Sequence, residues 1–180
     1  MSRLPTPDQT VGPFFRDGLV YSGDRDLVAP GTPGAIVLDG RVFDGSGEPV
    51  PDALIEIWQP DATGAIVSES GSRARRLGGF SGFGRCETDA EGWYTFTTFE
   101  PGPLADGAAA FFAVKVFARG LLAVLDTRIY VPGPALDSDP LLSALDPARR
   151  ATLVAERTAS GLRHDLRLQG PGETVFLAFR

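Results

Sequence analysis

The side chains best suited to catalysis are few in this sequence. It contains one histidine, His164, and one cysteine, Cys86, so neither has a second residue of its kind with which to share a metal ion. In the alternating segment "GLRHDLRL", a single histidine is typically a surface or hydrogen-bonded residue. Cys86, in "GRCETD", is typical of a small buried thiol. A zinc site needs clustered histidine and cysteine ligands, which the sequence does not supply.

Three other chemical arrangements find little support. A Ser-His-Asp triad could use His164 and Asp165, but no Gly-x-Ser-x-Gly elbow accompanies them. The run "LGGFSGFG" lacks the lysine and the helix start of a phosphate-binding loop. The run "LDSDP" could offer two carboxylates to calcium, although an N-cap for a short helix starting at Pro140 explains it more simply. From these residues alone, the chain does not assemble a convincing catalytic site.

Composition and charge narrow the class of protein. The chain has 180 residues, 43% of them hydrophobic and 22% charged, which is typical of one globular domain. Its net charge of −6, without a basic stripe, argues against a nucleic-acid partner. A lone cysteine, the absence of an apolar signal region and the absence of a long apolar run predict a cytoplasmic protein with no membrane partner.

Short strands separated by turns dominate the pattern. We expect strands at 35–44, 53–59, 110–119, 162–169 and 173–179, and a hairpin within 84–98. In 110–119 the even positions are all apolar. Asp146 and Pro147 predict the N-cap and first residue of a helix through "ARRATLVAERT". The expected fold is an all-β sandwich of about seven to nine strands over 36–180, with an extended N-terminal arm over 1–35 and a short C-terminal helical insert.

The stretch "LDGRVFDGSGEPVPDALIEIWQPDATG" resembles the core signature of the intradiol ring-cleavage dioxygenases, non-haem ferric enzymes that open catechols between their two hydroxyls. The matching residues are Gly40, Val42, Asp44, Gly47, Val50, Glu56, Ile57, Trp58 and Gln59. "FGRCETDAEGWYTFTT" and "PGP" resemble the hairpin and turn that follow. "TPDQTVGPFF" is similar to the opening of the subunits of two-subunit members, and "FARGLL", "LDTRIY" and "GETVF" are similar to their alpha subunits in particular. The resemblance therefore covers nearly the whole chain.

The resemblance also implies that this chain lacks the metal ligands of the family. Catalytic chains hold ferric iron with two tyrosinates and two histidines. The matching positions here are Ile66, Leu104, Phe111 and Ala113. The arginine that stabilises substrate charge in catalytic chains maps to Ala108. None of these side chains can coordinate iron, and we expect Ile66, Leu104 and Phe111 to fill the remnant site by packing.

A chain of this kind is implied to be a non-catalytic alpha subunit whose partner is an iron-bearing beta subunit of the same fold. The pair would cleave 3,4-dihydroxybenzoate with O2 to 3-carboxy-cis,cis-muconate, with ferric iron held by the beta subunit and none by this chain. The resemblance carries substrate-binding roles to Thr10, Gly12 and Pro13 in "QTVGPF" and to Arg119 in "FARG". A Gly-Pro turn allows close backbone approach, and an arginine suits a substrate carboxylate.

Other interpretations remain open from the sequence. The chain could be a stand-alone β-sandwich binding module, or an alpha-like subunit that serves a different catechol. A free-standing intradiol enzyme acting on catechol or hydroxyquinol would need iron in this chain, and the missing ligands argue against it. Arg119 could equally be an exposed charge at a strand end or an interface ion pair.

Overall fold

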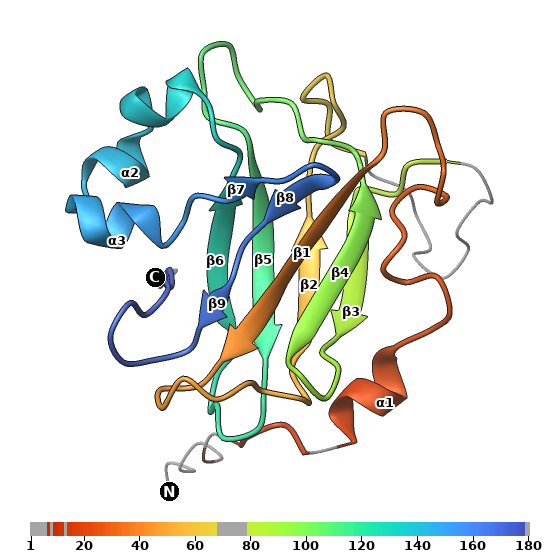
Figure 1. The fold of residues 1–180 in the computed structure, drawn as a ribbon, viewed down its shortest axis with the longest axis vertical. Helices are drawn as coiled ribbons and strands as arrows, with labels where there is room; N and C mark the ends of the chain where they lie inside the picture. The colour runs from red at the N-terminus through yellow and green to blue at the C-terminus, as the bar shows by residue number, and fades with distance from the viewer. Residues whose placement is uncertain (1–6, 8, 13, 68–78, 179–180) are drawn as a thin grey trace, which may run out of the picture.

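Two β-sheets packed face to face form the body of the molecule (Figure 1). The computed structural model describes residues 7, 9–12, 14–67 and 79–178. The first sheet has the order β4-β1-β8-β7 and contains β1 (Ile36–Phe43), β4 (Trp93–Thr98), β7 (Glu156–Arg157) and β8 (Gly161–Arg163), with β9 (Leu166–Arg167) also pairing with β1. The second has the order β3-β2-β5-β6 and contains β2 (Leu54–Trp58), β3 (Phe83–Glu87), β5 (Phe111–Phe117) and β6 (Leu125–Tyr130). The predicted all-β fold is therefore confirmed.

Strand alternation places the core between the two sheets. In β5 the even positions Phe112, Val114 and Val116 are buried, whereas the odd positions are half-buried. The first sheet contributes residues such as Leu38 and Phe96, which are fully buried in the same cluster. Successive side chains of a strand point to opposite faces, so the odd positions of β5 form the outer face of the second sheet. That outer face is available for functions other than packing the core.

The helices are short. They are α1 (Phe15–Leu19), α2 (Pro140–Ser143) and α3 (Pro147–Ala151), with a 3-10 turn at Pro134–Ser138. Asp146 does cap α3, accepting a hydrogen bond from the Arg149 amide at 3.0 Å, but the expected helix through residue 158 is wrong. The Ala155 amide donates to the Tyr130 carbonyl at 3.0 Å, and the next residues form β7. Pairing with the sheet therefore overrides local helix propensity. No helix in the described ranges is long and apolar enough to cross a membrane.

Two further expectations need correction, and two elements were not expected. The strand expected at 162–169 is split into β8 and β9 by His164 and Asp165. The strand expected at 173–179 is reduced, over its described residues, to one bridge between Asp126 and Leu177. The sequence pattern also missed β6. Within the arm, the described residues include the unpredicted helix α1, and the division into an arm and a sandwich domain stays a prediction.

The cap of α2 gives a testable energetic prediction. The buried Asp139 carboxylate accepts hydrogen bonds from the amides of Leu141 (2.9 Å) and Leu142 (3.0 Å) and from the Tyr130 hydroxyl (3.1 Å). Asp139→Ala is expected to lower the free energy of unfolding by about 2 kcal/mol, because it leaves three donors without an acceptor.

The exposed cap of α3 supplies the matched control. Asp146→Ala removes one amide bond and is expected to cost about 1 kcal/mol. Urea unfolding followed by circular dichroism measures both variants. Equal losses would show that the buried cap contributes no more than the exposed one.

Candidate functional site

The "EIWQ" segment that carries much of the family signature has a structural role here. Glu56 is buried and accepts a hydrogen bond from Arg85 Nε at 2.8 Å on the neighbouring strand. The Gln59 side chain accepts from Thr98 Oγ1 at 2.6 Å and donates to the Phe99 carbonyl at 2.9 Å. Thr98 belongs to β4, so Gln59 joins the second sheet to the first. These contacts fix the end of β2 and the turn that follows it.

The four positions matched to metal ligands lie on β5 and on two loops, one that follows β2 and one that precedes β5. Phe111 and Ala113 lie on the outer face of β5, where Ala113 is paired with Trp58 of β2. Ile66 and Leu104 belong to two loops that contact one another, because the Gly102 amide donates to the Asp61 carbonyl at 2.8 Å. None of these four side chains has a donor atom for a metal.

These residues do not fit an iron ion. Hydrocarbon side chains cannot replace tyrosinate oxygens or imidazole nitrogens as ligands. In the described part of the chain, no group of three or more histidine, cysteine, aspartate or glutamate residues could hold a metal ion. The chemistry of the donor set gives this region no means of activating a catechol.

The expectation that apolar residues fill the remnant site is wrong for two of them. The side chains of Ile66 and Leu104 leave 74% and 49% of their surface exposed. Phe111 is half-buried and packs against Tyr130, with a ring-centroid separation of 5.5 Å. Ile66 and Leu104 therefore do not pack into the remnant site.

Two of the predicted substrate-binding residues, Thr10 and Arg119, lie near the opposite end of β5. Thr10 Oγ1 accepts a hydrogen bond from the Gly120 amide at 2.8 Å, which joins the arm to the turn that contains Arg119. The Arg119 side chain is 57% exposed and forms an ion pair with Asp52. Among the described residues, no atom lies within 4 Å of a β-carbon added to Gly12, and Pro13 lies outside the described residues. The structure thus brings Thr10 and Arg119 into one neighbourhood across more than a hundred residues of sequence.

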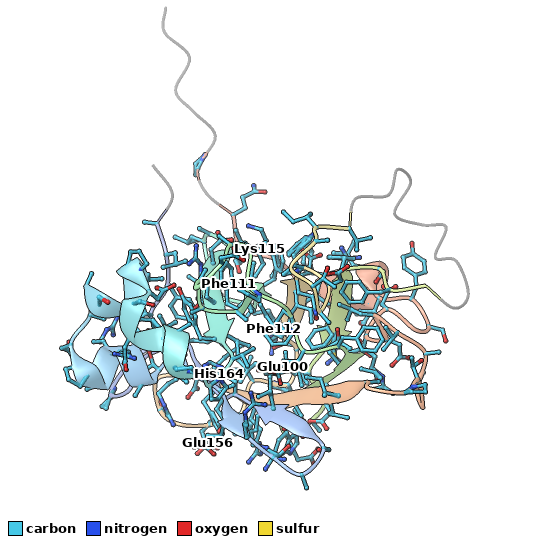
Figure 2. All side chains as sticks on the ribbon, turned by 90° about the horizontal axis from the view of Figure 1, so that it is seen from above. Glu100, Phe111, Phe112, Lys115, Glu156 and His164 are labelled. Carbon is cyan, nitrogen blue, oxygen red and sulfur yellow. The ribbon has the colours of Figure 1, made fainter. Side chains whose placement is uncertain are left out.

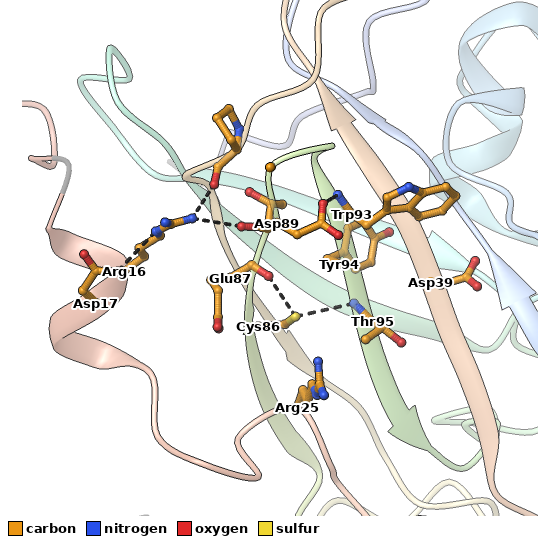
Figure 3. Close-up of a pocket in the computed structure, with 13 residues that line it drawn as sticks. Arg16, Asp17, Arg25, Asp39, Cys86, Glu87, Asp89, Trp93, Tyr94 and Thr95 are labelled. Carbon is orange, nitrogen blue, oxygen red and sulfur yellow. Dashed lines mark hydrogen bonds and ion pairs between the residues drawn. The ribbon is translucent and has the colours of Figure 1, made fainter.

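Cys86 is a buried, unreactive thiol, as its sequence context predicts. Its sulfur donates to the Glu87 carbonyl at 3.1 Å and accepts from the Thr95 amide at 3.5 Å (Figure 3). Burial raises the pKa of the thiol to about 11. Figure 3 shows it beside a cavity of about 610 Å³, where the Arg16 guanidinium donates to the carbonyls of Pro51 and Thr88. The thiol is therefore protonated at neutral pH and is a poor nucleophile.

His164 is buried and hydrogen-bonded, and it does not belong to a catalytic triad. Its Nε2 lies 3.0 Å from the Thr152 carbonyl oxygen, and its Nδ1 has no hydrogen-bond partner among the described residues. Burial lowers the pKa of the imidazole to about 4, so the ring is neutral at pH 7. The Asp165 carboxylate accepts a hydrogen bond from the Arg41 amide, at 2.9 Å. His164 thus supports the fold.

Comparisons with known proteins agree with this geometry. The dioxygenase family model matches residues 12–170, and the chain belongs to the intradiol ring-cleavage dioxygenases, a family of non-haem iron enzymes. It is 39% identical to the protocatechuate 3,4-dioxygenase alpha chain of Burkholderia cepacia, covering 95% of both chains. It is 37% identical to the corresponding alpha chain of Pseudomonas putida, covering 97% of this chain and 96% of that one.

A beta chain and a solved structure are also similar. The protocatechuate 3,4-dioxygenase beta chain of B. cepacia is 35% identical over 77% of this chain and 66% of its own length. The dioxygenase domain of a carbohydrate-binding fusion protein from Streptomyces sp. SirexAA-E superposes with a TM-score of 0.58 at 32% identity, covering 91% of this chain and 96% of that domain. The relatives therefore include both kinds of subunit.

Proposed function

We propose that this chain is the non-catalytic alpha subunit of a protocatechuate 3,4-dioxygenase. Its partner is an iron-bearing beta subunit of the same fold, and the complex converts 3,4-dihydroxybenzoate and O2 into 3-carboxy-cis,cis-muconate. The observation that carries the proposal is the replacement of all four ligand positions by Ile66, Leu104, Phe111 and Ala113 in a chain that keeps the family fold. The similarity to two alpha chains over nearly their whole length supports it.

In this proposal Thr10, Gly12, Pro13 and Arg119 line the mouth of the substrate pocket on the beta subunit. The bond between Thr10 and Gly120 supports this role because it fixes the arm beside the Arg119 turn. Arg119 is exposed, and its pairing with Asp52 orients the guanidinium while leaving donors free. An arginine held in this way can hydrogen-bond the substrate carboxylate and orient the ring, with a charge-assisted geometry.

The experiment that tests the proposal is affinity purification of the tagged chain from its native host. The expected product is a complex with a homologous beta chain that contains iron and oxidises protocatechuate. An iron-free monomer with no homologous partner would overturn the proposal and favour a stand-alone binding module. A complex that oxidises another catechol but not protocatechuate would overturn the assigned substrate.

Arg119→Ala gives a kinetic prediction for the assembled complex. We expect KM for protocatechuate to rise about tenfold while kcat changes much less, because the lost contact binds the substrate carboxylate and not the reacting atoms. Arg163→Ala is the matched control: Arg163 is an exposed arginine that pairs with Asp39 on the first sheet. An unchanged KM in the Arg119 variant would contradict the carboxylate role.

A further inference from the structure

The outer face of the second sheet carries a row of charges that neutralise one another. Arg85, Glu56, Lys115 and Asp126 follow each other across β3, β2, β5 and β6. Arg85 pairs with Glu56 at 2.8 Å, and Lys115 pairs with Asp126 at 2.5 Å. In Figure 2, Lys115 and Phe111 lie on this side of the molecule, and His164 and Glu156 lie on the opposite side. Arg85 and Lys115 therefore each form an ion pair with a carboxylate of the same row.

Arg128, on the same face, differs from the charges in this row. It lies opposite Ala113 in the pairing of β5 with β6, beside the positions matched to metal ligands. Its guanidinium carbon is 4.1 Å from the centre of the Phe111 ring, and its one hydrogen bond among the described residues goes to the Tyr130 hydroxyl, at 2.9 Å. No carboxylate in the described part of the chain pairs with it. A guanidinium has five N–H donors, so most of the donors of Arg128 have no acceptor among the described residues.

The surroundings of Arg128 are apolar and open. Trp58, on the same face, is 39% exposed, and the exposed side chains of Ile66 and Leu104 lie on loops at the same end of the sheet. A groove of about 460 Å³ adjoins this end, between residues 108–110 before β5 and residues 131–136 after β6. Arg128 lines neither this groove nor the cavity beside Cys86. Arg128 itself is half-buried, and a single charge outside any cavity would hold a free small carboxylate only weakly.

We propose that this end of the outer face docks the beta subunit, and that Arg128 binds the side chain of an aspartate or glutamate of that subunit. The inference rests on the proposed function. The unpaired cation selects a carboxylate by charge complementarity, while the exposed apolar side chains around it exclude water when the partner covers them. A protein surface supplies both features at once. Arg128 and these apolar side chains thus lie beside Ala113, a position that the resemblance matches to a metal ligand.

The first test measures assembly with the purified beta chain of the same host. Arg128→Gln is expected to raise the dissociation constant about tenfold or more and to reduce its dependence on salt. Arg163→Gln, on the first sheet, is expected to leave it unchanged. Matching circular dichroism spectra and melting temperatures for the free chains would show that both variants fold. Equal dissociation constants for wild type and Arg128→Gln would overturn the assignment of Arg128.

The second test keeps a cation at the position and needs no measurement of affinity. Arg128→Lys introduces an amine that carbodiimide couples to a carboxylate in direct contact, and mass spectrometry of the complex identifies the joined peptides. The expected product is an amide between position 128 and an aspartate or glutamate of the beta subunit. Arg163→Lys is expected to give none with that subunit.

The outcomes separate the two proposals. If the wild-type chain does not assemble with the beta chain, the proposed function fails. If it assembles but R128K gives no cross-link to the partner, only the role of Arg128 fails.

Discussion

Gly40→Ala is expected to lower the free energy of unfolding by about 3 kcal/mol. An alanine β-carbon at this position would overlap the carbonyl oxygen of His164, and would lie 2.6 Å from its carbonyl carbon and 2.9 Å from the Tyr94 hydroxyl. Two of these atoms are backbone, so no change of side-chain rotamer relieves the overlap. The first sheet would have to open between β1 and the segment that joins β8 to β9.

Urea unfolding measures the effect, and Gly79→Ala is the control because, apart from its chain neighbours, none of the described residues has an atom within 4 Å of its added β-carbon. If the two variants lose the same stability, the close approach of the His164 backbone to Gly40 does not constrain the fold. The expected difference would explain a glycine of the family signature in physical terms. Gly40 allows the backbone of His164 to lie close to β1, and any side chain at this position would prevent that contact.

Acidification from pH 7 to pH 4 is expected to remove about 3 kcal/mol of stability through His164 alone. The pKa of its imidazole is about 4 in the folded chain, against 6.5 when unfolded. The contribution is therefore fully present above pH 6.5 and is lost as the pH falls towards 4, because the unfolded state takes up the proton first. Burial is the main cause. The Thr152 carbonyl and the nearby Asp165 charge favour the protonated ring but do not compensate for its lost hydration.

The measurement is the free energy of unfolding of wild type and His164→Gln between pH 7.5 and pH 4.5. Glutamine can donate to the Thr152 carbonyl but does not titrate, so the variant isolates the contribution of the imidazole. The free energy of unfolding should fall more steeply with decreasing pH in the wild type than in the variant. The difference in slope should correspond to the uptake of nearly one additional proton when the wild type unfolds. Parallel curves would show that His164 keeps an ordinary pKa in the folded state.

The sequence predicted best what depends on local pattern. Alternation at 110–119 located β5 and its inward face, because a half-buried strand repeats every two residues. Asp146 correctly marked the start of α3, but its end could not be predicted, because the pairing of Ala155 with Tyr130 depends on the tertiary structure. The breaks around His164 arise from the close approach of its backbone to Gly40, which no local pattern records.

The same distinction applies to the candidate site. Residue identity was enough to show that Ile66 and Leu104 cannot bind a metal. It could not show that these side chains are exposed, because an apolar residue has the same identity in a core and at an interface. Arg128 had no sequence signal at all. Its importance in the proposed interface depends on its register with Ala113 and on the lack of a carboxylate partner in the described residues.

The pairing of β1 with the C-terminal strands has a consequence for how the chain folds during synthesis. Val37 pairs with Gly161, and Val42 with Leu166, so each contact closes a loop of more than a hundred residues. The second sheet needs nothing beyond Tyr130 for its strands, whereas the first cannot be completed until the C-terminal segment has left the ribosome. Contacts of such long range slow folding. The sheet that carries the proposed docking face can thus form first, while one edge of β1 remains open to wrong pairing until translation ends.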